Sequence, residues 1–249
     1  MSDQENEDKR KKERKKDKKK NKGVRLFPAN KKGYHIMRWL NFFKFFLLPW
    51  NAVLYPYKMY GNTKIGKGAC IFVGNHFCMW DVLYPARATK EGIHFLAKSS
   101  LTQAPVLRHW AVLIGAIEAM RDGSDVRALM DAMKCLKNGE KVSLFPEGTR
   151  NRVSDEEFLP FHGGFALMAI KTQSPIIPFV ICNRPRLFHR THVVFGDPIE
   201  LTEYYERKVA PEEYAEIEEK IKQRMYELRD EHRAFLEAKK KKKGKKCKS

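Results

Sequence analysis

Short apolar runs recur along the chain and alternate with longer stretches of mixed polarity. The runs typical of buried strands lie at 69–73, 94–98, 141–145, 176–182 and 192–196. Helical patterns lie at 99–115, where Pro105 interrupts the pattern, and at 124–140, 163–172 and 211–240. Because strands alternate with helices and no internal repeat is present, the pattern predicts one α/β domain with a largely parallel sheet flanked by helices.

Two of the predicted helices carry apolar residues at helical spacing. In the helix at 124–140, Ser124 is the expected N-cap and Gly139 suits the C-terminal end. The apolar stripe expected there consists of Val126, Leu129, Met130, Met133 and Leu136. The stripe of the final helix consists of Tyr214, Ile217, Ile221, Met225 and Leu228.

An aromatic segment at 34–61 precedes the alternating region. Arg38 and Lys44 interrupt its apolar residues, and Pro49 and Pro56 break its helical pattern. Because roughly 20 unbroken apolar residues are needed to cross a bilayer, the segment does not suit a spanning helix. Aromatic residues flanked by Lys and Arg are typical of the membrane interface, so we expect an interfacial helical hairpin with a bend near Pro49. The alternative is a buried hairpin packed on the domain.

The formal net charge of +19 resides mostly in the two ends of the chain. Residues 1–22 hold 11 Lys/Arg and 6 Asp/Glu, and residues 239–249 hold 8 Lys and no acidic residue. We expect disordered basic tails at 1–33 and 239–249, with the α/β domain and its C-terminal helix at 62–238. Such tails suit an anionic membrane, a nucleic acid or simple solvation. No nucleic-acid-binding motif lies between them, so we expect no nucleic-acid partner.

The cysteines and the N-terminus bear on the compartment. Five cysteines are scattered without paired spacing, which indicates neither a disulfide framework nor a zinc site, and favours a reducing, cytosolic compartment. No apolar segment directly follows the charged N-terminus, so we expect no signal peptide.

The first candidate for chemistry is the pair His76 and Asp81, which follows the apolar run at 69–73. On one continuous helix, residues five apart would point about 140° away from each other. The pair can meet only if His76 lies on the turn after a strand and Asp81 on the following helix. Asp81 would then accept a hydrogen bond from one imidazole nitrogen and leave the other as a base. The alternative is a structural histidine near an unrelated aspartate.

The second candidate is the stretch LFPEGTRNR, residues 144–152, after another apolar run. Gly148 permits close backbone approach to a ligand, Thr149 offers a hydroxyl, and Arg150 offers a planar donor fork that suits phosphate. Taken alone, the stretch is equally typical of a surface turn with a Glu–Arg pair.

The two stretches are expected to meet. In parallel α/β sheets, ligands bind beyond the carboxyl ends of the strands, where both stretches lie. Gly115 and Arg121 lie between them in the sequence and add a second arginine. A base beside two arginines predicts proton abstraction from a hydroxyl of a phosphate-bearing substrate.

These blocks resemble the glycerolipid (1-acyl-sn-glycerol-3-phosphate) acyltransferase family, of the phosphate acyltransferase C type. Asn75-His76 with Asp81 is similar to the family's first motif, and Gly115 to Arg121 to its second. Phe145 to Arg150 matches the third motif, and Ile176-Ile177-Pro178 resembles the fourth. The resemblance covers roughly residues 35–200 and implies a glycerol-3-phosphate acyltransferase-like fold. The sequence departs from the family's pattern after the third motif, where many relatives carry a lysine two residues before a glycine. This chain has Phe161-His162-Gly163 there, so His162 stands in place of that lysine.

The resemblance also implies a role for each residue. His76 is the general base, and Asp81 orients it. The substrate's phosphate would be held by Arg121, Glu147, Gly148, Thr149 and Arg150. The supporting residues would be Asn75, Gly115, Pro146 and Pro178. Cys78 is expected to be a small buried residue, and no metal or bound cofactor is implied.

The activity implied is transfer of a fatty acyl group from acyl-CoA or acyl carrier protein to the sn-2 hydroxyl of lysophosphatidic acid. The enzyme would lie peripherally on the cytoplasmic face of the membrane, in contact with anionic lipid. Three alternatives stay open: another acceptor, such as glycerol 3-phosphate or another lysophospholipid; a hydrolase using His76 with Cys78; and a basic binding protein without chemistry.

Overall fold

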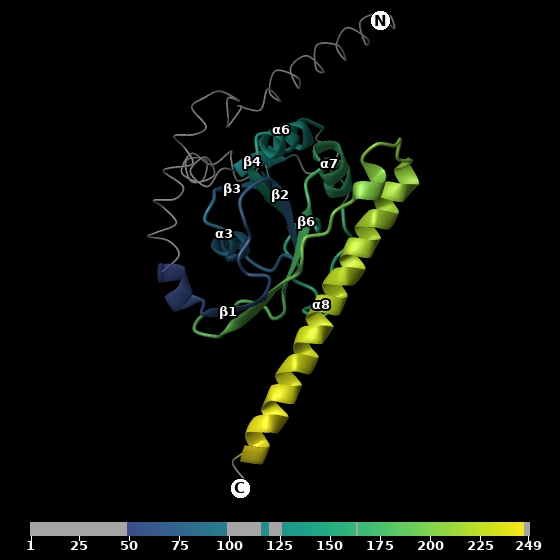
Figure 1. Cartoon of the computed structure of the whole chain (residues 1–249). Coiled ribbons are helices and arrows are strands. Elements are labelled where there is room, and N and C mark those ends of the chain that lie inside the picture. Colours follow the sequence, from purple (N-terminus) through teal and green to yellow (C-terminus); the bar gives the residue numbers. More distant parts are fainter. Residues whose placement is uncertain (1–48, 99–115, 120–125, 163, 247–249) are drawn as a thin grey trace, which may run out of the picture.

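The computed structural model describes residues 49–98, 116–119, 126–162 and 164–246, which contain a seven-stranded sheet (Figure 1). The strands are β1 (Tyr57–Gly61), β2 (Cys70–Gly74), β3 (Ile93–Lys98), β4 (Ala116–Ala119), β5 (Lys141–Leu144), β6 (Ile176–Ile181) and β7 (Thr191–Phe195). Their order across the sheet is β1-β7-β6-β2-β5-β3-β4. All neighbours are parallel except β6 and β7, so the predicted α/β class is confirmed.

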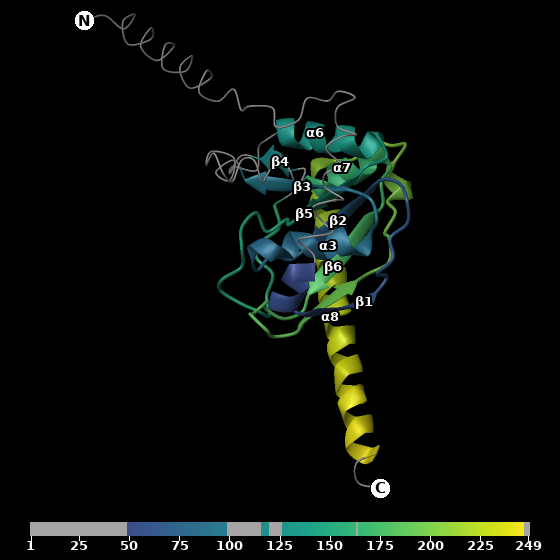
Figure 2. The same ribbon diagram turned by 90° about the vertical axis from the view of Figure 1, so that its left-hand side faces the viewer.

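Helices cover both faces of this sheet (Figures 1 and 2). The α-helices are α3 (Leu83–Ala88), α6 (Val126–Lys137), α7 (Phe165–Thr172) and α8 (Pro211–Lys246), and short 3-10 turns lie at Met79–Val82 and Thr202–Tyr204. One apolar cluster joins α6, α7 and α8 to one sheet face, and a second joins α3 to the other. Every residue of β2, β5 and β6 is buried, as expected for strands covered on both sides.

The core-facing side of α6 differs from the predicted stripe. Leu136 of the predicted stripe is buried and Leu129 and Met133 pack against the core, but Val126 and Met130 are 66% and 50% exposed. Ala128 and Ala132, which were not in the predicted stripe, are buried instead. The two alanines face the core because their small side chains let the helix lie close to the sheet and α7. The predicted C-terminal end is confirmed by Gly139, whose φ is +80°. Ser124 lies outside the described residues.

The segment predicted as helical at 34–61 is divided in the structure. Residues 49–54 are helical, as predicted for the part after Pro49. The prediction is wrong for Tyr57–Gly61, which forms β1 and pairs with β7. Pro56 ends the helical pattern, and the short alternation after it gives an edge strand. Residues 34–48 and the predicted helix at 99–115 lie outside the described residues.

The C-terminal helix is longer than predicted. Its expected stripe residues Ile217, Ile221, Met225 and Leu228 are buried on the sheet. The helix continues to Lys246, so it passes the boundary at 238 where we expected a disordered tail. In the ranges that the structure describes, no helix combines the length and apolar character needed to cross a membrane.

Candidate active site

His76 and Asp81 contact each other directly. The strand β2 ends at Gly74, His76 lies on the turn that follows, and Asp81 lies in the 3-10 turn Met79–Val82. The Nδ1 atom of His76 lies 2.9 Å from Oδ2 of Asp81. This strand–turn–helix placement is the one that the sequence required for the pair. With Nδ1 donating to the carboxylate, Nε2 is the nitrogen that can accept a proton.

The carboxylate of Asp81 also organises the turn around it. Its side chain has 0% exposure, and Oδ2 accepts further hydrogen bonds from the backbone N–H groups of Phe77 (2.6 Å) and Cys78 (2.7 Å). These bonds satisfy a charge that would otherwise be costly to bury. The carboxylate therefore fixes both the turn and the imidazole that the turn carries.

The thiol of Cys78 is poorly suited to act as a nucleophile. It donates a hydrogen bond to Oδ1 of Asp81 at 3.2 Å. Burial, followed by the nearby negative charge of Asp81, raises the pKa of Cys78 to about 12. Since the thiolate is the reactive form, this environment argues against the His76–Cys78 hydrolase.

The imidazole and the residue before it are held by the sheet. The ring of His76 stacks on Phe145 at a centroid distance of 4.2 Å. The side chain of Asn75 is buried and bridges to β6: its Nδ2 donates to the carbonyl of Ile181 (3.1 Å), and its Oδ1 accepts from the Ile181 N–H (2.8 Å). Asn75 therefore supports the site by continuing the β2–β6 pairing beyond the end of the strand.

Glu147 lies in a different place from the one expected of a phosphate ligand. Its side chain is buried, Oε1 accepts from the His76 N–H (2.8 Å), and Oε2 accepts from the Leu159 N–H (3.0 Å). Burial raises the pKa of Glu147, and these hydrogen bonds oppose that rise. Oε1 thus joins the two motif loops and Oε2 holds the segment after the third motif, and a carboxylate would repel a phosphate.

The remainder of the third motif is exposed beside the histidine. Gly148, Thr149 and Arg150 are all exposed, and Gly148 has a left-handed φ of +62°. The next residue, Asn151, donates its backbone N–H to the carbonyl of His76 at 2.7 Å. The hydroxyl of Thr149 and the guanidinium of Arg150 therefore belong to a loop that is bonded directly to the base.

The positions of the other predicted site residues vary. Pro146 is buried, and its carbonyl accepts from the N–H of His162 at 2.7 Å, which places that exposed histidine against the third motif. Pro178 is buried within β6 and pairs in register with Val73. Gly115 and Arg121 lie outside the described residues.

Two residues at the site had not been predicted. The side chain of Asn151 is buried: Nδ2 donates to the carbonyl of Glu157, and Oδ1 accepts from the N–H groups of Val153 and Ser154.

The second residue is Arg184. It donates to the carbonyl of Asn151 at 2.9 Å, and its guanidinium lies 4.9 Å from the ring centroid of Phe77. The sequence could have indicated Arg184 as a site residue, because it follows β6 and therefore lies at the same edge of the sheet as the two motifs.

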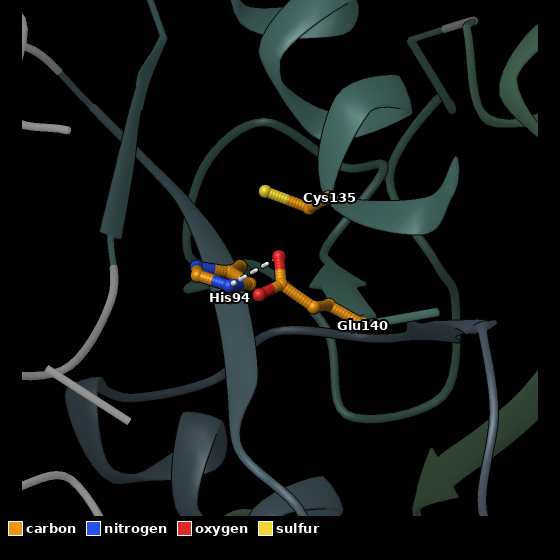
Figure 3. A group of neighbouring side chains, drawn as sticks. All are labelled: His94, Cys135 and Glu140. Carbon is orange, nitrogen blue, oxygen red and sulfur yellow. Dashed lines mark ion pairs between the residues drawn. The ribbon is translucent and has the colours of Figure 1, made fainter. Parts of the chain in front are cut away.

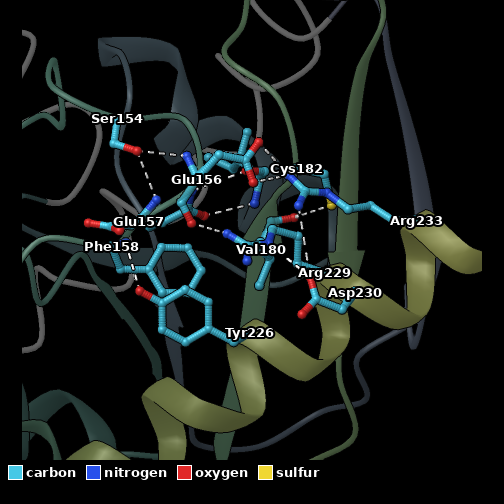
Figure 4. A network of polar contacts seen from close by, with 12 residues as sticks. Ser154, Glu156, Glu157, Phe158, Val180, Cys182, Tyr226, Arg229, Asp230 and Arg233 are labelled. Carbon is cyan, nitrogen blue, oxygen red and sulfur yellow. Dashed lines mark hydrogen bonds and ion pairs between the residues drawn. The ribbon is translucent and has the colours of Figure 1, made fainter.

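The loop after the third motif is anchored to α8 (Figure 4). Arg229 donates to the carbonyl of Glu156, and Arg233 pairs with the carboxylate of Glu156 at 2.6 Å. The N–H of Phe158 donates to the hydroxyl of Tyr226 at 3.0 Å, and the two rings stack. The long helix therefore positions the loop that carries Arg150.

Away from this site, three side chains have the residue types of a metal site. The ligand atoms of His94, Cys135 and Glu140 all lie within 4.8 Å of one another, and Nε2 of His94 lies 3.3 Å from Oε2 of Glu140 (Figure 3). Burial opposes the charge on His94, but hydrogen bonds to Cys135 and Glu140 outweigh it and raise the pKa of His94 to about 10. A metal ion would have to displace that proton, so we interpret the contact between the buried His94 and the partly buried Glu140 as an ion pair.

This ion pair gives a testable pH dependence. Because the folded pKa of His94 exceeds the unfolded value of 6.5, its contribution is complete below pH 6.5 and is lost as the pH rises towards about 10. We expect His94→Gln to lower the thermal midpoint at pH 6 and to have a much smaller effect at pH 10. Calorimetry of both proteins across this range measures the difference, and an equal loss at every pH would contradict the assignment.

Comparison with known proteins gives the family. The model of the family described as Acyltransferase matches residues 57–182, which are 126 of the 249 residues. The chain is 32% identical over 133 residues to the 1-acyl-sn-glycerol-3-phosphate acyltransferase of Helicobacter pylori, covering 51% of this chain and 55% of that protein. It is 28% identical over 167 residues to the Saccharomyces cerevisiae protein of the same name, covering 65% and 54%. The chain therefore spans about half the length of these curated relatives.

A solved structure shows the same fold. The crystal structure of the 1-acyl-sn-glycerophosphate (LPA) acyltransferase, PlsC, from Thermotoga maritima aligns with a TM-score of 0.59 and 20% identity, over 84% of this chain and 85% of that one. The matched span of the family model contains the His76–Asp81 pair, the third motif and Pro178. On this match, the chain belongs to the Acyltransferase family.

Proposed function

We propose that the protein transfers a fatty acyl group from acyl-CoA or acyl carrier protein to the sn-2 hydroxyl of lysophosphatidic acid, giving phosphatidic acid. The proposal rests mainly on the position of His76 next to the exposed loop that contains Arg150. Asp81 accepts a hydrogen bond from Nδ1 of His76, and the N–H of Asn151, in the Arg150 loop, donates to the carbonyl of the same histidine. A base of this kind suits a hydroxyl substrate, and the loop suits a phosphate. The names of the relatives agree with both.

The reaction follows from this arrangement. Nε2 of His76 accepts the proton of the sn-2 hydroxyl as its oxygen attacks the thioester carbonyl. The carbonyl carbon forms the new C–O bond, its C–S bond breaks, and the imidazolium returns the proton to the departing thiolate. Asp81 stabilises the imidazolium between these two steps. No covalent acyl-enzyme is needed, in keeping with the raised pKa of Cys78.

The phosphate of the acceptor would lie on the exposed part of the third motif. Arg150 supplies a bidentate cation, Thr149 a hydroxyl, and Gly148 a close backbone approach. Arg121 is proposed as a second cation, on the resemblance of its motif. We reassign Glu147 from phosphate ligand to positioning residue, because its oxygens bond the backbones of His76 and Leu159.

The proposed location is the cytoplasmic face of a membrane, with the protein bound peripherally. Lysophosphatidic acid carries a long apolar chain, so a site at the bilayer surface avoids moving that chain through water. Either acyl carrier would reach the same site from the aqueous side as a substrate, without a resident cofactor.

Arg150 provides the sharpest test of the acceptor. We expect Arg150→Ala to raise the KM for lysophosphatidic acid by about 10- to 100-fold, because a charge-assisted hydrogen bond is lost, and to leave the KM of the acyl donor nearly unchanged. Steady-state kinetics with each substrate varied in turn measure both values. Arg207→Ala, which removes an exposed arginine beyond β7, at the sheet edge marked by the bridge between Ile176 and Ile199, is the matched control.

The same assay separates the acceptors. Lysophosphatidic acid, glycerol 3-phosphate and lysophosphatidylcholine are offered to the wild-type protein at equal concentration with one acyl donor. We expect the highest kcat/KM with lysophosphatidic acid. A higher kcat/KM with either of the other two compounds would mean that the protein uses a different acceptor within the same family. If Arg150→Ala changed only the KM of the acyl donor, Arg150 would not be the phosphate ligand.

A further inference from the structure

The turn between β6 and β7 presents apolar side chains to solvent. It runs from Arg186 to His189, and the N–H of His189 donates to the carbonyl of Arg186 at 3.1 Å. Its two central residues are Leu187, 52% exposed, and Phe188, 71% exposed. A tight turn of this kind ordinarily carries polar residues or glycine at these positions, so an exposed Leu-Phe pair calls for an explanation.

The backbone of the turn makes the choice of residue more unusual. Phe188 has a left-handed φ of +59°, and it is one of two non-glycine residues with positive φ in the described part of the chain. Glycine or asparagine adopts this conformation at lower cost than a bulky aromatic residue. Strain of this kind is a reason to look for a function of the side chain.

The turn is continuous with other exposed apolar side chains. The N–H of Phe188 donates to the carbonyl of Leu54 at 2.7 Å, which joins the turn to the helical residues 49–54. On that helix Trp50 is 72% exposed and Val53 is also exposed. We call the set Trp50, Val53, Leu54, Met79, Leu187 and Phe188, all exposed, the apolar rim.

The rim reaches the catalytic turn from two sides. The rings of Tyr55 and Trp80 lie 6.0 Å apart, which links residues 49–54 to the turn that contains Met79 and Asp81. On the other side, Arg184 lies in the β6–β7 loop and contacts both Phe77 and Asn151. The rim therefore borders the site rather than a remote part of the molecule.

Positive charge surrounds the turn. Arg184, Arg186, His189 and Arg190 lie in this loop, and no Asp or Glu occurs from Asn183 to Gly196. Arg186 and Arg190 are exposed, whereas Arg184 pairs with Asp155. An apolar tip between exposed arginines matches the chemistry of an anionic bilayer surface, where apolar groups enter the acyl region and arginines meet lipid phosphates.

We propose that the apolar rim docks on the surface of an anionic bilayer, with Leu187 and Phe188 inserted at the lipid interface and Arg186 and Arg190 against the headgroup phosphates. The site of His76 then opens beside the lipid from which a chain-bearing acceptor would come. The proposal assigns the β6–β7 turn to membrane binding together with the helical residues 49–54. The purpose that we give to this docking surface rests on the proposed function, whereas the test below measures membrane binding alone.

The test uses Phe188→Asn in the full chain. Asparagine accepts positive φ, so the variant should keep or raise the thermal midpoint while losing the anchor. We expect its partition into mixed vesicles of phosphatidylglycerol and phosphatidylcholine to fall about tenfold, the scale expected for a lost buried aromatic side chain. Sedimentation over a range of lipid concentrations measures the partition coefficient.

Two further variants make the result specific. Arg186→Gln and Arg190→Gln should each lower partition into the anionic vesicles by about fivefold, and have little effect with pure phosphatidylcholine. Met130→Asn, which removes a half-exposed apolar side chain from α6 on the opposite face of the sheet, should leave partition unchanged.

The outcomes separate this proposal from the proposed function. Wild-type protein that does not bind the vesicles, Phe188→Asn that binds as well as wild type, or Met130→Asn that loses as much binding would each overturn the docking surface. Acyl transfer in detergent should persist in Phe188→Asn. If the wild type bound vesicles through Phe188 but transferred no acyl group, the docking surface would stand and the enzyme assignment would fall.

Discussion

Replacing His76 with alanine is expected to lower the kcat of acyl transfer by about 10²- to 10⁴-fold, the contribution typical of a positioned general base. The variant removes the nitrogen that accepts the hydroxyl proton and leaves the donors to Asp81 from Phe77 and Cys78 in place. The fold should therefore survive the change. The loss should appear in kcat at saturating acceptor, because the loop of Arg150 still binds phosphate.

The measurement is single-turnover formation of product by wild type and His76→Ala, with the thermal midpoints of both recorded. His162→Ala is the matched control, since His162 also lies against the third motif but is not bonded to Asp81. Its kcat at saturating acceptor should remain close to that of wild type, because a cationic contact between His162 and the acceptor would change KM instead. Equal rates for His76→Ala and wild type would make His76 a structural histidine, and a large drop for His162→Ala alone would reverse the assignment.

Asp81→Asn is expected to have an effect of similar size, a loss of up to about 10⁴-fold in kcat. An amide oxygen can replace Oδ2 as acceptor for the three N–H groups that meet there. The negative charge that stabilises the imidazolium of His76 is lost. The variant thus separates the electrostatic role of Asp81 from its role in shaping the turn.

Kinetics and thermal unfolding of Asp81→Asn distinguish the two roles. We expect a folded protein with nearly unchanged KM values and a much lower kcat. Cys78→Ser is the companion variant: its hydroxyl keeps a hydrogen bond to Oδ1 of Asp81, and its activity should stay near that of wild type. Loss of activity in Cys78→Ser with full activity in Asp81→Asn would instead support the thiol chemistry of a hydrolase.

Much of the fold and the main catalytic pair could be predicted because each depends on local pattern. Strands β2 and β6 are buried on both faces, so their sequences, CIFVG and IIPFVI, are apolar runs that are easy to recognise. Parallel strands bring their carboxyl ends to one edge. That rule was sufficient to predict that His76 and the loop of Arg150 would meet.

The features that were missed depend on tertiary contacts. Tyr57–Gly61 carries too short an alternation to be recognised as a strand, and only its pairing with β7 makes it one. A glutamate next to Gly-Thr-Arg has the composition of a surface loop, and nothing local indicates that Glu147 is buried between two backbone N–H groups. Arg184 lies more than 30 residues from Asn151 in the sequence, and β6 brings it to the site.

The most direct test of the account is product formation by the purified full chain in detergent. Lysophosphatidic acid is supplied with an isotopically labelled acyl-CoA, and in a second reaction with the acyl carrier protein thioester. We expect labelled phosphatidic acid and an equal amount of free thiol from at least one donor, and neither product from His76→Ala. Release of free thiol together with labelled fatty acid, without phosphatidic acid, would contradict acyl transfer and identify a hydrolase.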